Sequence, residues 1–155
     1  MRRQWKILIR VIPTVMLGAL IAPACNKHTA PSPLPVTVTL RSFHITLSQS
    51  TVQAGTIIFT VRNTATDDHH EFLIIRTDRA PNALPTEANG SYEENGPGTQ
   101  LLDEIDDVPP GQTKQLSIDL AKGNYVVICN MVHVEADGSI EVHYQLGMHE
   151  AFRVE

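Results

Sequence analysis

Polar and apolar side chains alternate along most of the chain after residue 35, and this period of two predicts half-buried β-strands. Val36, Val38 and Leu40, for example, alternate with threonines. Residues 72–75 form a continuous apolar run, which is typical of a strand buried on both faces. The same alternation recurs in residues 43–47, 57–61, 116–118 and 152–154.

Turn residues separate these segments, and no stretch has the period and caps of a long helix. Pro-Pro-Gly at 109–111 forms one turn, and Lys-Gly-Asn at 122–124 leads into the apolar residues 125–128. Residues 101–108 are expected to hold a brief helical turn. Residues 76–100 are rich in proline and glycine and predict a long loop. Roughly seven short strands in one domain indicate an all-β fold, an antiparallel Greek-key β-sandwich.

The first 24 residues differ from the rest because they join a basic start to an apolar stretch. They carry four basic residues and no acid, and residues 11–22 are largely apolar. This order is typical of a secretory signal peptide, and Ala-Pro-Ala at 22–24 offers small residues for cleavage. Cys25 comes next, as in a bacterial lipoprotein signal, so acylation of Cys25, ordinary cleavage after Ala24 and an uncleaved anchor are all open. Each of these outcomes places the domain outside the cytoplasm, in the periplasm or cell envelope.

The chain beyond the signal is an extended tether and then an acidic domain. Residues 25–35 hold three prolines and predict the tether, and the domain is expected at 36–155. Loss of residues 1–24 would take the formal charge from −5 to −9. Such an acidic domain offers no basic surface for nucleic acid. The acidic run at 103–107 is either a soluble face or a surface that attracts a basic redox partner.

Cys129 is the one cysteine inside the predicted domain, so a disulfide cannot form there. His133, His143 and His149 come after it within twenty residues, together with Met148. Imidazole, thiolate and thioether are soft ligands, and two histidines, one cysteine and a weak methionine describe a blue-copper site. A lone cysteine is otherwise an ordinary small core residue. These neighbours favour a metal site instead.

Several short motifs occur in a characteristic order along the chain. They are Asn63, His-Glu-Phe at 70–72, Pro-Pro-Gly at 109–111, Gly-Asn-Tyr-Val-Val-Ile-Cys-Asn at 123–130, His-Tyr-Gln-Leu-Gly-Met at 143–148 and Phe-Arg-Val at 152–154. Across residues 36–155 the chain therefore resembles the cupredoxin family of small, plastocyanin-like exported copper proteins. The resemblance implies a β-sandwich that binds one copper ion and cycles it between Cu(I) and Cu(II). It implies an electron carrier between redox proteins rather than an enzyme.

The same resemblance implies the copper ligands, which would be His70, Cys129, His143 and Met148. The family has only a few residues between the cysteine and the second histidine, whereas this chain has thirteen. Residues 133–142 therefore look like an inserted hairpin. His133, four residues after Cys129, is the alternative to His143 as the second imidazole ligand.

The remaining candidates have plainer interpretations. His69 is the alternative to His70, whose alternation with Phe72 fits the family pattern better. Asn63 would resemble the family asparagine that ties the cysteine loop to the neighbouring strand, the other interpretation being an ordinary turn residue. Three histidines are expected to be solvated, and one methionine to pack in a loop: His28, His44, His149 and Met131.

Other functions remain open at this point. A copper-binding module for delivery, sequestration or resistance would use His133 and the long loop to exchange metal. A cupredoxin fold without metal would serve as an interaction domain. Zinc is the main alternative metal, but Met148 and the late ligand loop argue against it, and the sequence has no close pair of cysteines of the kind common in structural zinc sites. A hydrolase with Cys129 as nucleophile lacks any sign of an oxyanion hole.

Overall fold

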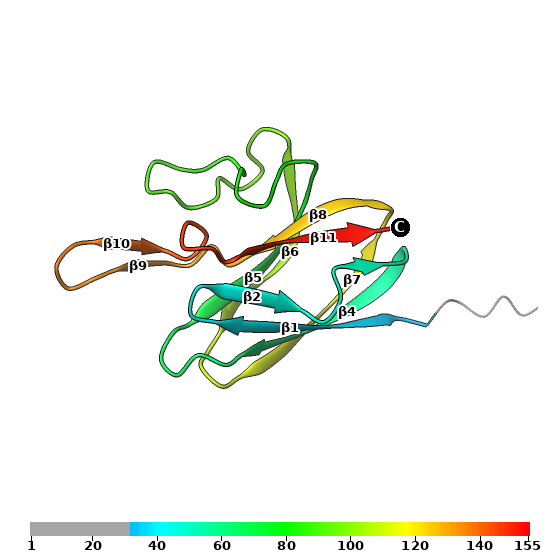
Figure 1. The fold of residues 1–155 in the computed structure, drawn as a ribbon, viewed down its shortest axis with the longest axis horizontal. Coiled ribbons are helices and arrows are strands. Elements are labelled where there is room, and N and C mark those ends of the chain that lie inside the picture. The colour runs from blue at the N-terminus through cyan, green and yellow to red at the C-terminus, as the bar shows by residue number, and fades with distance from the viewer. Residues whose placement is uncertain (1–31) are drawn as a thin grey trace, which may run out of the picture. The chain divides into compact units, whose positions relative to one another are not determined.

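The computed structural model describes residues 32–155, which form two packed β-sheets and a separate hairpin (Figure 1). The predicted signal at 1–24, the lipidation at Cys25 and most of the tether lie outside the described residues. Residues 32–155 contain no helix that is long and apolar enough to cross a bilayer. In spatial order, the four-stranded sheet consists of β2 (His44–Leu47), β1 (Leu34–Arg41), β4 (Gly55–Asn63) and β7 (Thr113–Leu120). The five-stranded sheet consists of β3 (Thr51–Val52), β11 (His149–Val154), β8 (Gly123–Ile128), β5 (His70–Thr77) and β6 (Thr99–Val108), and the hairpin of β9 (Val132–Val134) and β10 (Ile140–Val142).

The strand pairing confirms the predicted all-β sandwich. Most neighbouring strands are antiparallel, and the pairs β1–β4 and β3–β11 are parallel. The chain crosses between the sheets after β2, β3, β4, β6 and β7, which is consistent with Greek-key connections.

The helical turn expected at residues 101–108 is wrong, because these residues belong to strand β6. β6 pairs with β5 with two register shifts, between His70 and Phe72 and between Ile74 and Ile75. These irregularities explain how Leu102 and Ile105, an odd number of residues apart, both pack against the same apolar cluster. Pairing with the largely buried strand β5 outweighs the weak local preference for a turn.

An apolar cluster fills the space between the two sheets, and we call it the inner cluster. Alternation along each strand supplies it, because every second side chain points inward. Phe59 lies at its centre, with ring centroids 5.3 Å from Phe72 and 5.4 Å from Phe152. The buried members of the inner cluster are Val36, Val38, Leu40, Ile45, Val52, Ile57, Phe59, Val61, Phe72, Ile74, Val108, Leu120, Tyr125, Val127, Cys129, Met148, Phe152 and Val154.

A second apolar cluster, the outer cluster, covers the other face of the five-stranded sheet. The predicted continuous run at 72–75 is buried on both faces because its side chains alternate between the two clusters. The long loop at 78–98 supplies Leu84 and Tyr92 to the outer cluster (Figure 1, green). The buried members are Leu73, Ile75, Leu84, Tyr92, Val126, Ile128, Val142 and Tyr144.

Candidate metal centre

Three predicted ligands meet at one end of the sandwich. His70 opens β5 and has the same inward orientation as Phe72, while Cys129 continues the inward series of Tyr125 and Val127 just after β8. His143 lies directly after β10. The strand register therefore brings residues that are distant in sequence to one buried position.

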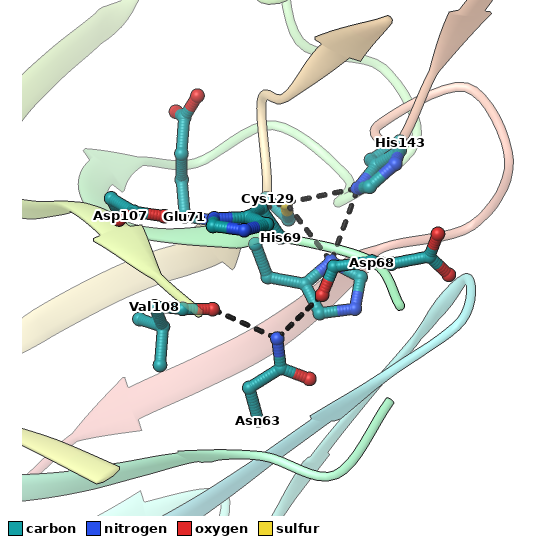
Figure 2. Close-up of polar contacts among 9 residues, drawn as sticks. Asn63, Asp68, His69, Glu71, Asp107, Val108, Cys129 and His143 are labelled. Atoms are coloured by element: carbon teal, nitrogen blue, oxygen red, sulfur yellow. Dashed lines mark hydrogen bonds and ion pairs between the residues drawn. The ribbon is translucent and has the colours of Figure 1, made fainter. Parts of the chain in front are cut away.

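The donor atoms of these three side chains face one another. The Nδ1 atoms of His70 and His143 lie 3.1 Å apart, and they lie 3.8 Å and 3.4 Å from Cys129 Sγ. All three residues are completely buried, and their potential ligand atoms lie within 4.8 Å of one another. Figure 2 shows the contact between Cys129 and His143. The structure thus brings together His70, Cys129 and His143 out of the predicted set.

Met148, the fourth predicted ligand, lies in the same part of the molecule. Its side chain is completely buried in the inner cluster that also contains Cys129. Its carbonyl accepts a hydrogen bond from the Cys129 amide at 3.0 Å, and its amide donates to the His143 carbonyl at 3.0 Å. Gly147, with a φ of 110°, provides the left-handed residue that closes this turn. The backbone therefore joins the residues at 129, 143 and 148 in one compact loop.

Burial keeps the two imidazoles neutral. It lowers the pKa of His70 to about 4, and the neighbouring His143 contributes to the same shift. The pKa of His143 is also lowered, first by burial and then by His133, while Glu141 opposes the shift. At neutral pH both rings therefore keep a lone pair that can bind a cation.

The thiol is held neutral by the same burial. Burial raises the pKa of Cys129 to about 12, although the backbone amides of Glu71 and Met131 favour the thiolate. The Glu71 amide donates to Cys129 Sγ at 3.2 Å. A bound cation would offset the cost of a buried thiolate and release the thiol proton. Two neutral imidazoles and one such sulfur are the donor set that copper and zinc prefer, so the residues fit a soft metal ion.

Asn63 holds the segment before His70 rather than the cysteine loop. Its Nδ2 donates to the carbonyls of Asp68 at 2.7 Å and Val108 at 2.8 Å (Figure 2). Its Oδ1 accepts from the Ala65 amide at 2.8 Å. The predicted tie to the cysteine loop is therefore wrong. Because His70 pairs with Val108, these bonds fix the strand end that carries the histidine.

The alternative histidines do not face the sulfur. His69 points outward and contacts Asp107, with Nδ1 2.8 Å from Oδ1 (Figure 2). His133 is not part of the His-Cys-His group, and its ring contacts that of His143, with 5.1 Å between the two centroids. His44 is exposed, and His149 is partly buried beside Tyr144. Of the two candidates for the second imidazole, the structure places His143 beside Cys129.

Met131 packs against the inner cluster, as expected, and its backbone also serves the site. Its carbonyl accepts a hydrogen bond from the His143 amide at 3.0 Å. Its own amide contributes to the environment of the Cys129 sulfur. Met131 therefore links the cysteine to the start of the ligand loop.

Two residues near His143 were missed by sequence reasoning. Phe43, at the β1–β2 turn, places its ring edge-on against His143 at 5.6 Å, with a φ of 60° that is rare outside glycine. Glu141 places Oε1 3.3 Å from His143 Nε2. Strand pairing within the expected hairpin could have indicated that Glu141 lies near the candidate ligands, because Glu141 is directly opposite His133. No pattern in the sequence indicated Phe43.

Comparisons with known proteins identify the fold. No family model matches the chain, and no curated protein matches it. The structure is similar to dithionite-reduced auracyanin from Roseiflexus castenholzii, with 20% identity, a TM-score of 0.53, and coverage of 82% of this chain and 99% of that chain. It is also similar to auracyanin A from Chloroflexus aurantiacus, a "blue" copper protein, with 14% identity, a TM-score of 0.52, and coverage of 80% and 100%. Reduced rusticyanin gives 16% identity, a TM-score of 0.57 and coverage of 82% of each chain. The chain therefore has the cupredoxin fold predicted from its motifs.

Proposed function

We propose that this chain is a mononuclear copper protein that carries one electron at a time between redox proteins. The single observation that carries the proposal is the buried meeting of His70, Cys129 and His143 at one end of a cupredoxin fold. Met148 would complete the set as a weak thioether ligand. The likeness to auracyanin A, a "blue" copper protein, supports the same metal.

When bound, copper would supply a one-electron Cu(I)/Cu(II) couple. The chain's own residues would hold the ion and limit movement around it. Strand β5 fixes His70, the inner cluster fixes Cys129, and the backbone bonds of Met148 and Met131 fix His143. A site held on rigid elements changes little between oxidation states, which keeps the cost of electron transfer low. Complete burial also excludes water from the sulfur.

Glu71 and the acidic run at 103–107 form an acidic face close to this site, and this face would attract a basic redox partner. Glu71, whose amide bonds the sulfur, has its pKa raised to about 7, first by burial and then by Glu104 and Asp106. Long-range attraction of this kind raises the rate of encounter at low salt. The electron partner would therefore be a protein with a positive surface.

We also propose that the carrier works outside the cytoplasm. The basic and apolar order of residues 1–24 supports export, and Cys25 supports an acyl anchor at a membrane surface. Acylation would hold the domain at the membrane through lipid chains in place of a spanning helix.

Copper delivery or sequestration is a second candidate, and His133 favours it. Its ring lies 5.1 Å from that of His143, and its Nε2 is buried without a hydrogen-bond partner among residues 32–155. An extra imidazole beside a ligand could receive the ion during transfer to an acceptor. Fast, reversible electron exchange with retained copper supports the carrier, whereas copper transfer with poor redox cycling supports delivery.

Absorption spectroscopy of the copper-loaded protein tests the main proposal. We expect an intense visible band from thiolate-to-copper charge transfer, and its complete loss in Cys129→Ser. His69→Ala is the matched control, because His69 adjoins His70 in sequence but points to Asp107. A colourless Cu(II) protein would overturn the proposal. Unchanged metal content in Cys129→Ser would show that the metal binds elsewhere.

A further inference from the structure

Hairpin β9–β10, the predicted insertion, has two different faces. Glu135 and Ser139 close its turn through backbone bonds, with Gly138 at a φ of 86°. Val134 and Ile140 face each other across the strands and are 74% and 54% exposed. Neighbouring positions on a strand point to opposite faces. His133 and Glu141, the next cross-strand pair, therefore share the other face.

That second face lies against His143. The His133 ring lies 5.1 Å from the His143 ring, tilted by 50°, and Glu141 Oε1 lies 3.3 Å from His143 Nε2. Phe43 closes the site from the β1–β2 turn. As a result no part of the His143 side chain is exposed, although it lies in a loop. The hairpin and Phe43 therefore cover this imidazole and keep it from solvent.

The two nitrogens of His143 have different surroundings. Nδ1 faces Cys129 Sγ and His70 Nδ1, so a cation bound among these atoms would use the Nδ1 lone pair. The ring proton must then lie on Nε2. Nε2 is buried and has no aligned hydrogen-bond partner among residues 32–155. Glu141 Oε1 is the acidic oxygen at pairing distance from it.

A buried N–H without an acceptor is costly, and a carboxylate behind a ligating imidazole both fixes the ring and makes it a better donor. Glu141 can supply that acceptor with a small movement, since its side chain remains 28% exposed. Glu135, on the same hairpin, is exposed, and its hydrogen bonds among residues 32–155 are the backbone bonds of the turn.

We propose that Glu141 is a positioning residue of the metal centre, accepting a hydrogen bond from Nε2–H of His143 and so aiming Nδ1 at the metal beside Cys129. This inference rests on the proposed function, since it assigns a role to Glu141 at the same site. Glu141 lies on hairpin β9–β10, so the hairpin places this carboxylate beside the buried His143 ring.

Three variants of the full chain test the proposal. Glu141→Ala should weaken copper affinity about 10–100-fold, the usual cost of losing such a partner, and should shift the visible band and the reduction potential. Glu141→Gln keeps an acceptor oxygen and should stay within a few-fold of the original affinity. Glu135→Ala is the control and should change none of these quantities. If Glu141→Ala keeps the copper affinity, the visible band and the reduction potential of the original protein, the inference is overturned.

A measurement on the metal-free protein separates this inference from the proposed function. Imidazole ¹⁵N chemical shifts should show His143 protonated at Nε2 in the original protein, and a mixture of both tautomers in Glu141→Ala. Identical tautomers in the two proteins would overturn the role of Glu141 even if copper binds. Absence of an intense band in the original protein, with the expected tautomers, would overturn the copper carrier and leave the contact between Glu141 and His143 established.

Discussion

The five-stranded sheet is buried on both faces, but by different kinds of structure. On the inner face, strands of the other sheet cover β5 and β8 with side chains such as Phe59 and Val38. On the outer face, the irregular loop at 78–98 covers the same strands with Leu84 and Tyr92. The inner cover is held by strand ladders, whereas the outer cover is held by a few side-chain hydrogen bonds.

The candidate metal centre lies where these two covers meet. Cys129 and Met148 belong to the inner cluster, while Val142 and Tyr144, on either side of His143, belong to the outer cluster. The sulfur is therefore positioned by sheet packing, and one imidazole by packing under a loop. Because the two covers are built differently, global stability and site geometry can be disturbed separately.

The largest expected effect comes from the centre of the inner cluster. Phe59→Ala removes a completely buried ring that contacts Phe72 and Phe152, and should lower the free energy of unfolding by about 3–5 kcal/mol. Denaturant unfolding measures this loss as a shift of the midpoint. Val134→Ala, at a 74% exposed position, is the control and should change stability by about 0.5 kcal/mol or less.

A loss below about 1 kcal/mol in Phe59→Ala would contradict the view that the inner cluster carries global stability. It would mean that the sheets close the space left by the ring, or that the outer cluster is the main source of stability.

The outer cluster should respond more weakly and more locally. The Tyr144 hydroxyl accepts from the Leu84 amide at 2.9 Å and donates to the Pro81 carbonyl at 3.0 Å. Tyr144→Phe removes both bonds and leaves the ring. We therefore expect the free energy needed to open the long loop locally to fall by about 1–3 kcal/mol. Hydrogen exchange should speed up at Leu84 while the amides of β4 stay protected. Equal acceleration in β4 would show that the two covers unfold as one unit.

Strand alternation made the inner face predictable from sequence. Val36, Val38 and Leu40 needed only a period of two, and the same period placed His70 inside and His69 outside. The choice between His143 and His133 depended on the motif spacing, and the structure places His143 beside the sulfur.

The outer cover and its contacts could not be predicted in the same way. Tyr144 reaches Leu84 and Pro81 across some sixty residues of chain, and such contacts have no local period. Glu141 reaches His143 only because the hairpin folds back, and Phe43 only because a turn holds it at positive φ. The register shifts in β6 likewise hid a strand from the alternation.

The smallest expected effect concerns Glu104, a residue of β6 that belongs to neither buried cluster. It tests whether the charge on this strand affects stability. Burial raises the pKa of Glu104 above its ordinary value of 4.5, and Glu94 and Asp106 raise it further. The folded state therefore binds this proton more tightly than the unfolded chain does. This contribution to stability is fully present below about pH 4.5 and falls as the pH rises through the folded pKa.

Glu104→Gln removes that dependence, so the stability of the variant relative to the original protein should rise as the pH increases above about 4.5. Because Glu104 is partly exposed to solvent, the gain should be about 0.5 kcal/mol or less. Loss of the Glu104 charge also relieves Glu71, which it helps to keep protonated, so both changes act in the same direction. Thermal unfolding at several pH values measures the difference, with Glu87→Gln, an exposed acid on the long loop, as the control. A stability difference that is independent of pH, or that favours the original protein near neutral pH, would contradict this prediction. It would show that solvent fully screens the acidic face and that the two apolar clusters alone set stability.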